Sequence, residues 1–254
     1  MLLPRHGSGL ALVVLLSGLP TSRLEAQARY PHVIRWYEAA AAVGGVALLS
    51  VVDEPIQDWI QDHRSEGTDD AAGIFRREGE PIWWGGITVG VTAVGLIIGD
   101  DDVTRTGARA ITSVAASAVA STGIKYLLSR SRPAEGVGAF EFHPFSSLKD
   151  SAGVELRFSM PSGHTTAAFA VATTLADAIQ SPVADVLLYT FATGTAWSRM
   201  NDDRHWLTDT AFGAILGITT AKVVNGRWRI FNLRPPAFLV GKEGTVALSW
   251  QASF

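Results

Sequence analysis

The chain has 254 residues, of which 47% are apolar and 18% are charged, and its formal net charge is −3. A chain of this composition can bury a substantial core, which excludes a disordered protein, and its charge excludes a basic protein that coats nucleic acid. Cysteine is absent. Disulfide bonds, thiol catalysis and cysteine-ligated metal sites are therefore excluded together.

The N-terminal segment has the pattern of an export signal. A weakly basic start at Arg5 and His6 precedes an apolar run over residues 10–19, and residues 26–28 (Ala-Gln-Ala) match the small-x-small pattern of a signal-peptidase site. The apolar run is short for a membrane span. We therefore predict a signal peptide over residues 1–28, with an uncleaved membrane anchor as the alternative. Either one directs the chain to or through a membrane.

Residues 29–104 form a predicted N-terminal group of helices. The Ala-rich segment 36–52 indicates a first helix. Residues 82–99 carry no charge, and as a helix they would reach about 27 Å at about 1.5 Å per residue, which is close to the thickness of a bilayer core. The pairs of glycines four residues apart in this segment favour close helix–helix approach.

A polar, acidic stretch, residues 53–80, lies between these two helices. It contains one short amphipathic helix over residues 56–62, in which Ile56, Trp59 and Ile60 share one face.

Residues 105–225 contain the predicted core bundle. Apolar residues spaced as in bundles indicate four helices, at 106–128, 162–180, 183–199 and 205–224. The loop 129–160 separates the first two, and loops of this length inside a compact domain are usually functional or disordered.

The tail, residues 226–254, differs from the rest of the chain. Two apolar runs within 237–251 flank Lys-Glu-Gly, which predicts a small β-hairpin. One hairpin cannot span a membrane. The predicted fold class is therefore all-α, a bundle of about six helices with a short C-terminal β-hairpin.

Three clusters of residues carry the chemistry. In the first, Lys125 near the end of a helix is followed after six residues by Arg132 and Pro133. Lys125 alone could simply extend its ammonium group to a surface. The proline keeps Arg132 out of helical geometry, so two cations near one helix exit could bind an anion.

The second cluster, residues 161–164, opens a helix. Ser162 is a plausible N-cap, Gly163 allows close backbone approach, and His164 follows. Free N–H groups and the helix dipole favour a phosphate at such a position. The alternative is an ordinary cap followed by a surface histidine.

The third cluster contains Ser198, Arg199, His205 and Asp209. His205 and Asp209 are four residues apart on the last predicted helix and so share one face. A carboxylate there can hold one ring nitrogen of the imidazole and leave the other free to attack, and Arg199 adds a bidentate anion donor. Neighbouring Asp202 and Asp203 are not expected to bind metal, because adjacent carboxylates point apart and no further ligand is evident.

Together, K-x6-RP at 125–133, PSGH at 161–164 and SR-x5-H-x3-D at 198–209 resemble the three-part signature of the type 2 phosphatidic acid phosphatase superfamily. That superfamily also includes bacterial acid phosphatases and vanadium haloperoxidases. The resemblance covers roughly residues 105–225, and all three parts are complete and in order.

The resemblance implies an all-helical bundle that hydrolyses phosphate monoesters or lipid (pyro)phosphates without metal or cofactor, with vanadate as an inhibitor. His205 would attack phosphorus and form a phosphohistidine, Asp209 would orient His205, and His164 would protonate the leaving oxygen. The phosphoryl oxygens would be held by Lys125, Arg132, Ser162, the Gly163 N–H and Arg199.

Two alternatives stay open: a vanadate-dependent haloperoxidase using the same pocket, and a non-catalytic envelope protein that binds phospholipid headgroups. The expected partners are a phosphorylated lipid or a small phosphoester and a membrane, not nucleic acid. The expected location is the cell envelope, either in the inner membrane with the site facing the periplasm or as a soluble periplasmic protein. A site that faces the periplasm from the inner membrane requires that two helices span the membrane before it. Segment 36–52 would then lie in the membrane interface or pack against the bundle.

Overall fold

The structure, a computed structural model, describes residues 31–78, 80–145, 158–230, 237–240 and 246–249. The predicted signal peptide at 1–28 lies outside these residues. The described part is mostly helical and includes eight α-helices. Their bounds are α2 Trp36–Leu49, α3 Asp53–Asp62, α4 Glu66–Glu78, α5 Pro81–Ile98, α6 Asp101–Leu128, α7 Gly163–Ile179, α8 Pro182–Asn201 and α9 Leu207–Val224.

Short elements complete the fold. Two 3-10 turns lie at Ser50–Val52 and Pro133–Glu135. Strands β3 (Ala237–Val240) and β4 (Val246–Ser249) pair antiparallel, which confirms the predicted hairpin. Strands β1 (His32–Ile34) and β2 (Trp228–Ile230) form a parallel pair that the sequence did not predict.

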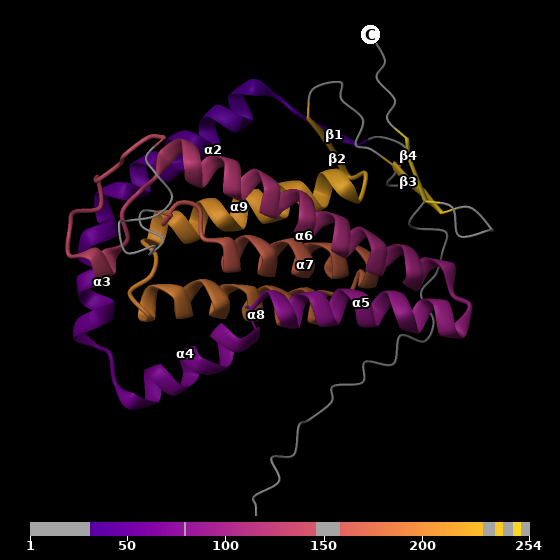
Figure 1. Ribbon diagram of the computed structural model, residues 1–254, viewed down its shortest axis with the longest axis horizontal. Helices are drawn as coiled ribbons and strands as arrows, with labels where there is room; N and C mark the ends of the chain where they lie inside the picture. Colours follow the sequence, from indigo (N-terminus) through magenta and orange to yellow (C-terminus); the bar gives the residue numbers. More distant parts are fainter. Residues whose placement is uncertain (1–30, 79, 146–157, 231–236, 241–245, 250–254) are drawn as a thin grey trace, which may run out of the picture.

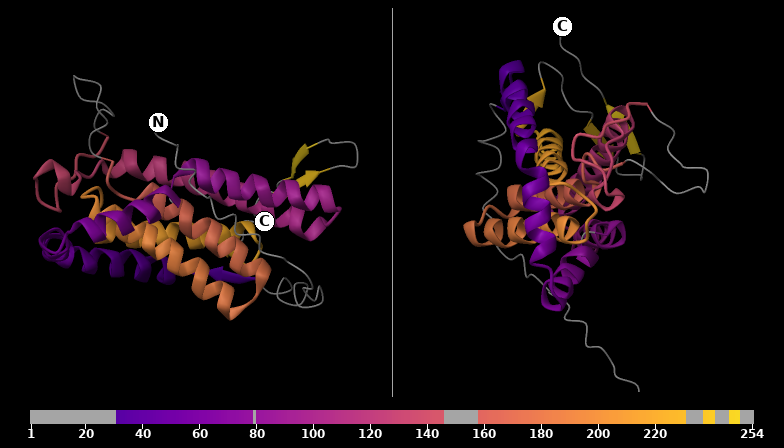
Figure 2. Two further views of the ribbon diagram at one scale, coloured as in Figure 1. Left: turned by 90° about the horizontal axis from the view of Figure 1, so that it is seen from below. Right: turned by 90° about the vertical axis from the view of Figure 1, so that its left-hand side faces the viewer.

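Helix α7 is the centre of the bundle. Helices α5 to α9 run roughly along the long axis, and α7 packs against α5, α6, α8 and α9 (Figures 1 and 2). Its alanines and threonines are small enough for this close packing: Ala168, Val171 and Ala172 form one apolar core with Trp84 of α5 and Ala192 of α8. One end of the bundle holds the end of α6, the start of α7, the end of α8 and the start of α9 (Figure 1).

Several helices are suited to a membrane. Trp36–Asp62, Asp101–Leu128 and Leu207–Val224 are long and apolar enough to cross one, and a fourth span results if the bent pair Glu66–Arg77 and Ile82–Ile98 counts as one. Large apolar side chains are also exposed on α2, α5, α6 and α8, namely Leu48, Ile82, Val89, Leu96, Ile97, Ile98, Val119, Val183, Val186 and Leu187. Extended apolar surface of this kind is rare on water-soluble proteins.

The short helix predicted within residues 53–80 is confirmed as α3, but its start and its buried face differ from the prediction. The predicted helix at 56–62 begins three residues earlier, and its buried residues are Asp53, Gln57 and Ile60, whereas Trp59 is exposed. Gln57 is buried because its amide donates to the Met200 carbonyl and to Asp203. The buried face of α3 is therefore partly polar, held by hydrogen bonds to residues distant in sequence, and not the apolar face that the periodicity predicted.

Helix α4 was not predicted from the sequence. Its apolar residues are few, and its position depends on Phe75, whose ring lies so close to Gly194 of α8 that a Cβ there would collide with it. Phe75 thus packs α4 against α8, and such tertiary packing stabilises a short helix.

Candidate active site

Close packing of α7 against α9 brings the second and third sequence clusters together. A Cβ on Gly217 would collide with the Thr166 carbonyl oxygen, and one on Gly213 would lie 2.8 Å from the Ser162 carbonyl oxygen. Near their starts, the Ser162 N–H donates to the Asp209 carbonyl at 2.9 Å. Only glycine permits this approach, so the two helices start side by side.

His205 lies just before α9, not on it. The sequence analysis placed His205 in the helix, but α9 begins at Leu207, because the Asp209 carboxylate accepts the Trp206 N–H at 2.9 Å and caps the helix start. His205 is 4% exposed, and its Nδ1 lies 3.6 Å from Oδ2 of Asp209. That distance is longer than a hydrogen bond, and the pair needs a small ring movement to close it. The imidazole of His205 and the carboxylate of Asp209 are therefore close together, as predicted. They are brought together by the helix cap at the start of α9 and not by a shared helix face.

The electrostatic surroundings keep His205 neutral. The pKa of its imidazole is lowered to about 3, chiefly by burial and also by the charges of Lys125 and Arg132, against the opposing effect of Asp209. A neutral ring has a free nitrogen lone pair, which a nucleophile requires.

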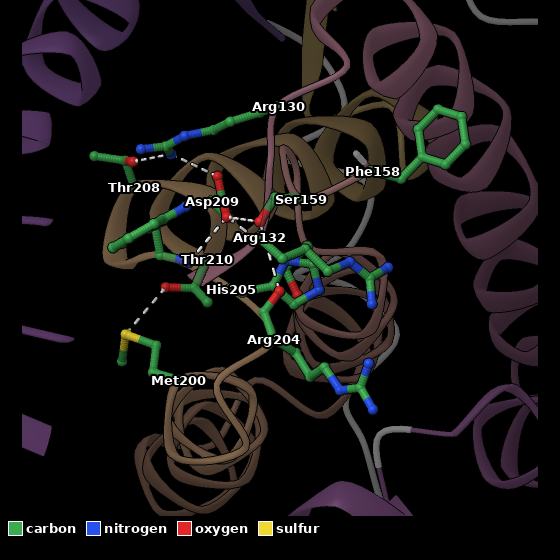
Figure 3. Close-up of polar contacts among 12 residues, drawn as sticks. Arg130, Arg132, Phe158, Ser159, Met200, Arg204, His205, Thr208, Asp209 and Thr210 are labelled. Atoms are coloured by element: carbon green, nitrogen blue, oxygen red, sulfur yellow. Dashed lines mark hydrogen bonds and ion pairs between the residues drawn. The ribbon is translucent and has the colours of Figure 1, made fainter. Parts of the chain in front are cut away.

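Asp209 is fully buried and its oxygens are occupied. Oδ1 accepts from Nη1 of Arg130 at 2.7 Å, and Oδ2 accepts from the Ser159 hydroxyl and the Trp206 N–H. Figure 3 shows the carboxylate between Arg130 on one side and Ser159 and His205 on the other. These donors stabilise the ionised carboxylate and fix its direction.

The α7 N-terminus lies beside Lys125. The Ser162 hydroxyl caps α7 by accepting the Thr165 N–H, as predicted. Cε of Lys125 is 4.0 Å from the position a Gly163 Cβ would take, and its Nζ donates to the Phe158 carbonyl at 2.6 Å. A helix start with an adjacent ammonium group is a favourable place for an anion.

His164, in the first turn of α7, is half-buried. Its pKa is lowered to about 4 by burial first and then by the charges of Arg199, Lys125 and Arg132. Lys125 and Arg132 thus act on both imidazoles. The structure therefore brings the residues of all three clusters to one end of the bundle.

Arg199 is 8% exposed. Its Nη1 pairs with Asp202 at 2.9 Å, and its buried Nε has no hydrogen-bond partner among the described residues. A buried donor without a partner is costly, and an incoming anion would satisfy it.

The sequence analysis missed three residues of this site, Arg130, Asp53 and Ser159, and gave Asp202 no role in it. Asp202 bridges Arg199 to Arg76 of α4, and Ser159 bonds Asp209. The only signal for Arg130 was its place two residues before Arg132, where a second arginine had no assigned role. No group of three or more potential metal-ligating side chains was found within the described residues.

An apolar cleft of about 460 Å³ adjoins the site. Its walls come from α2, α6, α9 and the loop after α6, and Arg130, Met160 and Thr208 line it as well. Arg130 donates to Thr208 and to Asp209, so the cleft borders the buried network around Asp209.

Comparison with known proteins bears on these residues. The family model described as the PAP2 superfamily matches residues 106–231, about half of the chain and including every residue of the three clusters. The chain belongs to the PAP2 superfamily. This confirms the resemblance seen in the sequence and classes the protein with the PAP2-type phosphoric ester hydrolases.

A curated relative, the lipid A 1-phosphatase of Porphyromonas gingivalis, is 43% identical over 72 residues. The match covers 28% of this chain and 16% of the relative's length.

Two crystal structures share the fold. That of Aquifex aeolicus LpxE superposes with a TM-score of 0.50 at 18% identity, over 68% of this chain and 94% of its own. That of a transmembrane PAP2-type phosphatidylglycerolphosphate phosphatase from Bacillus subtilis gives a TM-score of 0.57 at 18% identity, over 75% of this chain and 95% of its own. At this identity the likeness concerns the fold.

Proposed function

We propose that this protein is a membrane-embedded phosphatase that removes a phosphate group from a lipid phosphate or pyrophosphate through a phosphohistidine on His205, without metal. The observation that carries the proposal is a buried, neutral imidazole with an ionised carboxylate on one side and the charges of Lys125 and Arg132 acting on it.

The first half-reaction uses the three clusters together. Lys125, Arg132, Arg199 and the N–H groups at Ser162 and Gly163 bind the phosphoryl oxygens and stabilise the charge that builds on them in the transition state. Nε2 of His205 forms the P–N bond while the P–O bond to the leaving group breaks. Asp209 orients the ring through Nδ1–H and stabilises the positive charge that the ring acquires.

His164 supplies a proton to the leaving oxygen, which departs as an alcohol. The negative charge of a bound phosphate opposes the cations that lower the pKa of His164, so binding raises its proton affinity. In the second half-reaction His164 takes a proton from water, whose oxygen attacks phosphorus and breaks the P–N bond. Inorganic phosphate leaves and His205 is neutral again.

The apolar cleft favours a lipid over a water-soluble ester. It is lined by α2 and α6, where Val43 and Leu127 are exposed, and by Arg130 and Thr208 of the buried network around Asp209. A hydrocarbon chain lying there would bury apolar surface at about 25 cal/mol per Å². The names of the relatives, lipid A 1-phosphatase and phosphatidylglycerolphosphate phosphatase, support a lipid substrate class.

We propose that the site lies in the inner membrane and faces the periplasm, which requires that Trp36–Asp62, a candidate span by length and composition, packs against the bundle without crossing the membrane. The signal-like N-terminus, the apolar surface of α2, α5, α6 and α8, and the candidate spans support a membrane location. A soluble periplasmic protein is the competing arrangement.

The proposal is tested on protein expressed in a bacterial host. We expect the protein in the membrane pellet, and we expect the detergent-purified enzyme to release phosphate from dioctanoyl phosphatidic acid in excess EDTA, with inhibition by orthovanadate. The kcat/KM for this lipid should exceed that for p-nitrophenyl phosphate by about tenfold or more, because only the lipid fills the cleft.

A cleft variant provides the matched control. Leu127→Gln should lower kcat/KM for the lipid and leave that for p-nitrophenyl phosphate unchanged, since the side chain lines the cleft away from the phosphate. Loss of activity in EDTA, or halide oxidation with vanadate and peroxide but no phosphate release, would overturn the mechanism. Equal values for both esters would overturn the lipid assignment.

A further inference from the structure

Behind the candidate nucleophile lies a chain of three fully buried charges. Arg130 is 1% exposed, and the side chains of Asp53 and Asp209 are 0% exposed. Nη2 of Arg130 is 2.7 Å from Oδ2 of Asp53, and Nη1 is 2.7 Å from Oδ1 of Asp209. Taking charges out of water is costly unless they are well paired, so a triad of this kind needs an explanation.

Arg130 differs from the arginines assigned to phosphate. A guanidinium has five N–H donors, and five hydrogen bonds use them: Nε and Nη2 donate to the Ala139 carbonyl, Nη2 to Asp53, and Nη1 to Thr208 and Asp209. The guanidinium also lies over the rings of Phe142 and Trp206. Arg130 therefore has no donor left for a substrate oxygen.

Asp53 connects this triad to a distant part of the chain. It is the first residue of α3, outside the segment 106–231 that matches the family. Its Oδ1 accepts the Thr208 N–H at 2.9 Å, and its Oδ2 accepts the Thr208 hydroxyl. Because Thr208 is the second residue of α9, Asp53 satisfies a free N–H at the start of the helix that positions Asp209 and His205.

We propose that Asp53 and Arg130 are positioning residues that set the direction and the charge of Asp209 toward His205, an inference that rests on the proposed function. Arg130 stabilises the ionised form of Asp209, which keeps the proton on Nδ1 of His205 during attack. The triad carries a net charge of −1, from one arginine and two aspartates. Formation of the phosphohistidine gives the imidazole ring a positive charge and brings the sum of triad and ring to zero, so the triad stabilises the intermediate more than the resting state.

The charged groups facing His205 determine how each change acts on it. They are Asp209 on α9, Lys125 on α6 and Arg132 in the loop after α6, with Arg130 and Asp53 behind Asp209. Loss of the Arg130 charge leaves two unpaired carboxylates and raises the proton affinity of His205. Loss of the Asp53 charge lowers that affinity. If Arg130 and Asp53 had only a structural role, neither substitution would change the proton affinity of His205.

The test compares Arg130→Gln, Arg130→Lys and Asp53→Asn with Glu54→Gln. Glu54 is the neighbouring carboxylate, which accepts the Ala139 N–H without touching Arg130, and the glutamine keeps an acceptor oxygen. Phosphate release is measured against pH with p-nitrophenyl phosphate and dioctanoyl phosphatidic acid. The fraction of folded protein is measured by thermal unfolding in detergent.

We expect Arg130→Gln and Asp53→Asn to lower kcat by about tenfold or more, with KM within about twofold, as found for residues that orient a reactive group. The acid limb of the pH profile should move to higher pH in Arg130→Gln. It should not rise in Asp53→Asn or in Arg130→Lys, which keeps the charge. Glu54→Gln should match the wild type. An acid limb at the same pH in all variants, or wild-type kcat in Asp53→Asn, would overturn the proposal.

A second readout separates this inference from the proposed function. The imidazole nitrogens of ¹⁵N-histidine-labelled protein report the protonation of His205 by NMR without any substrate, with His205→Gln providing the assignment. If the wild type hydrolyses no ester, the proposed function fails, yet a higher titration midpoint of His205 in Arg130→Gln than in Asp53→Asn would still support the coupling. Identical titration of His205 in the two variants would refute the coupling. If Arg130→Gln does not fold, Asp53→Asn alone decides the kinetic test.

Discussion

The two ends of the α7–α9 helix pair each hold a carboxylate, but the two are built differently. At the end away from the site, Asp177 of α7 pairs with Lys222 of α9 and accepts from Asn225, and its side chain is 13% exposed. At the site end, Asp209 is fully buried and its partners come from the loop after α6 and the segment before α7. The far end joins two helices, whereas the site end joins several segments of the chain around one imidazole.

This difference indicates which polar contacts serve chemistry. Water reaches the pair of Asp177 and Lys222, whose side chains are 13% and 25% exposed, and screens it more than the fully buried network at the site end. A fully buried polar network is costly unless its donors and acceptors are satisfied. At the site end the buried Nε of Arg199 has no partner among the described residues, which leaves a donor for a bound anion. Substitutions at the two ends should therefore separate activity from stability.

The largest effect is expected at His205. In His205→Gln the proposed nucleophile is lost, so phosphate release should fall by at least about 1,000-fold, because the glutamine amide cannot form the covalent intermediate. Phosphate release from dioctanoyl phosphatidic acid measures the loss, and thermal unfolding in detergent verifies the fold. His143→Gln is the matched control, since His143 lies in the loop after α6 and pairs with Glu141, and it should retain activity. A His205→Gln enzyme with most of its activity would exclude the phosphohistidine.

How much of this site could be predicted from sequence depends on how local its determinants are. The three clusters were found because their spacing is a local pattern around helix ends, and Ser162 does cap α7. The placement of His205 on a helix was wrong, because the cap formed by Asp209 starts α9 after it. Arg130 and Asp53 were missed because their role depends on a contact across 77 residues of sequence, which no periodicity reveals.

An intermediate effect is expected where the two helices touch. Gly217→Ala would place a methyl group against the Thr166 carbonyl oxygen and near Phe169, and overpacking of this kind costs about 1–3 kcal/mol. Thermal unfolding in detergent should show the loss. Activity per folded molecule should fall as well, because a displaced α9 moves His205 away from His164.

The control for this change is Gly123→Ala on α6, where an added Cβ would meet nothing within 4 Å. It should be neutral or stabilising by up to about 1 kcal/mol, since alanine is the better helix former. Equal destabilisation by the two substitutions would show that helix propensity, not the α7–α9 contact, accounts for the loss.

The fold could be predicted to a similar extent. The six long helices and the hairpin follow from apolar periodicity and turn residues, whereas α4 and the β1–β2 pair do not. The parallel pair joins residues 32–34 to residues 228–230, so its only determinant is the packing that brings the two distant segments together.

The smallest effect is expected at the far end. Asp177 lies near the C-terminus of α7, where a negative charge is unfavourable to the helix dipole. Asp177→Asn would thus lose the pair with Lys222 and gain relief from the dipole, for a net loss of under about 1 kcal/mol in the free energy of unfolding. Phosphate release should stay within about twofold of wild type. Asp209→Asn, the same chemical change at the other end of the helix pair, should lower kcat far more than it lowers stability. Comparable losses of kcat in the two variants would show that the ends are coupled, and the division between a catalytic end and a structural end would then be wrong.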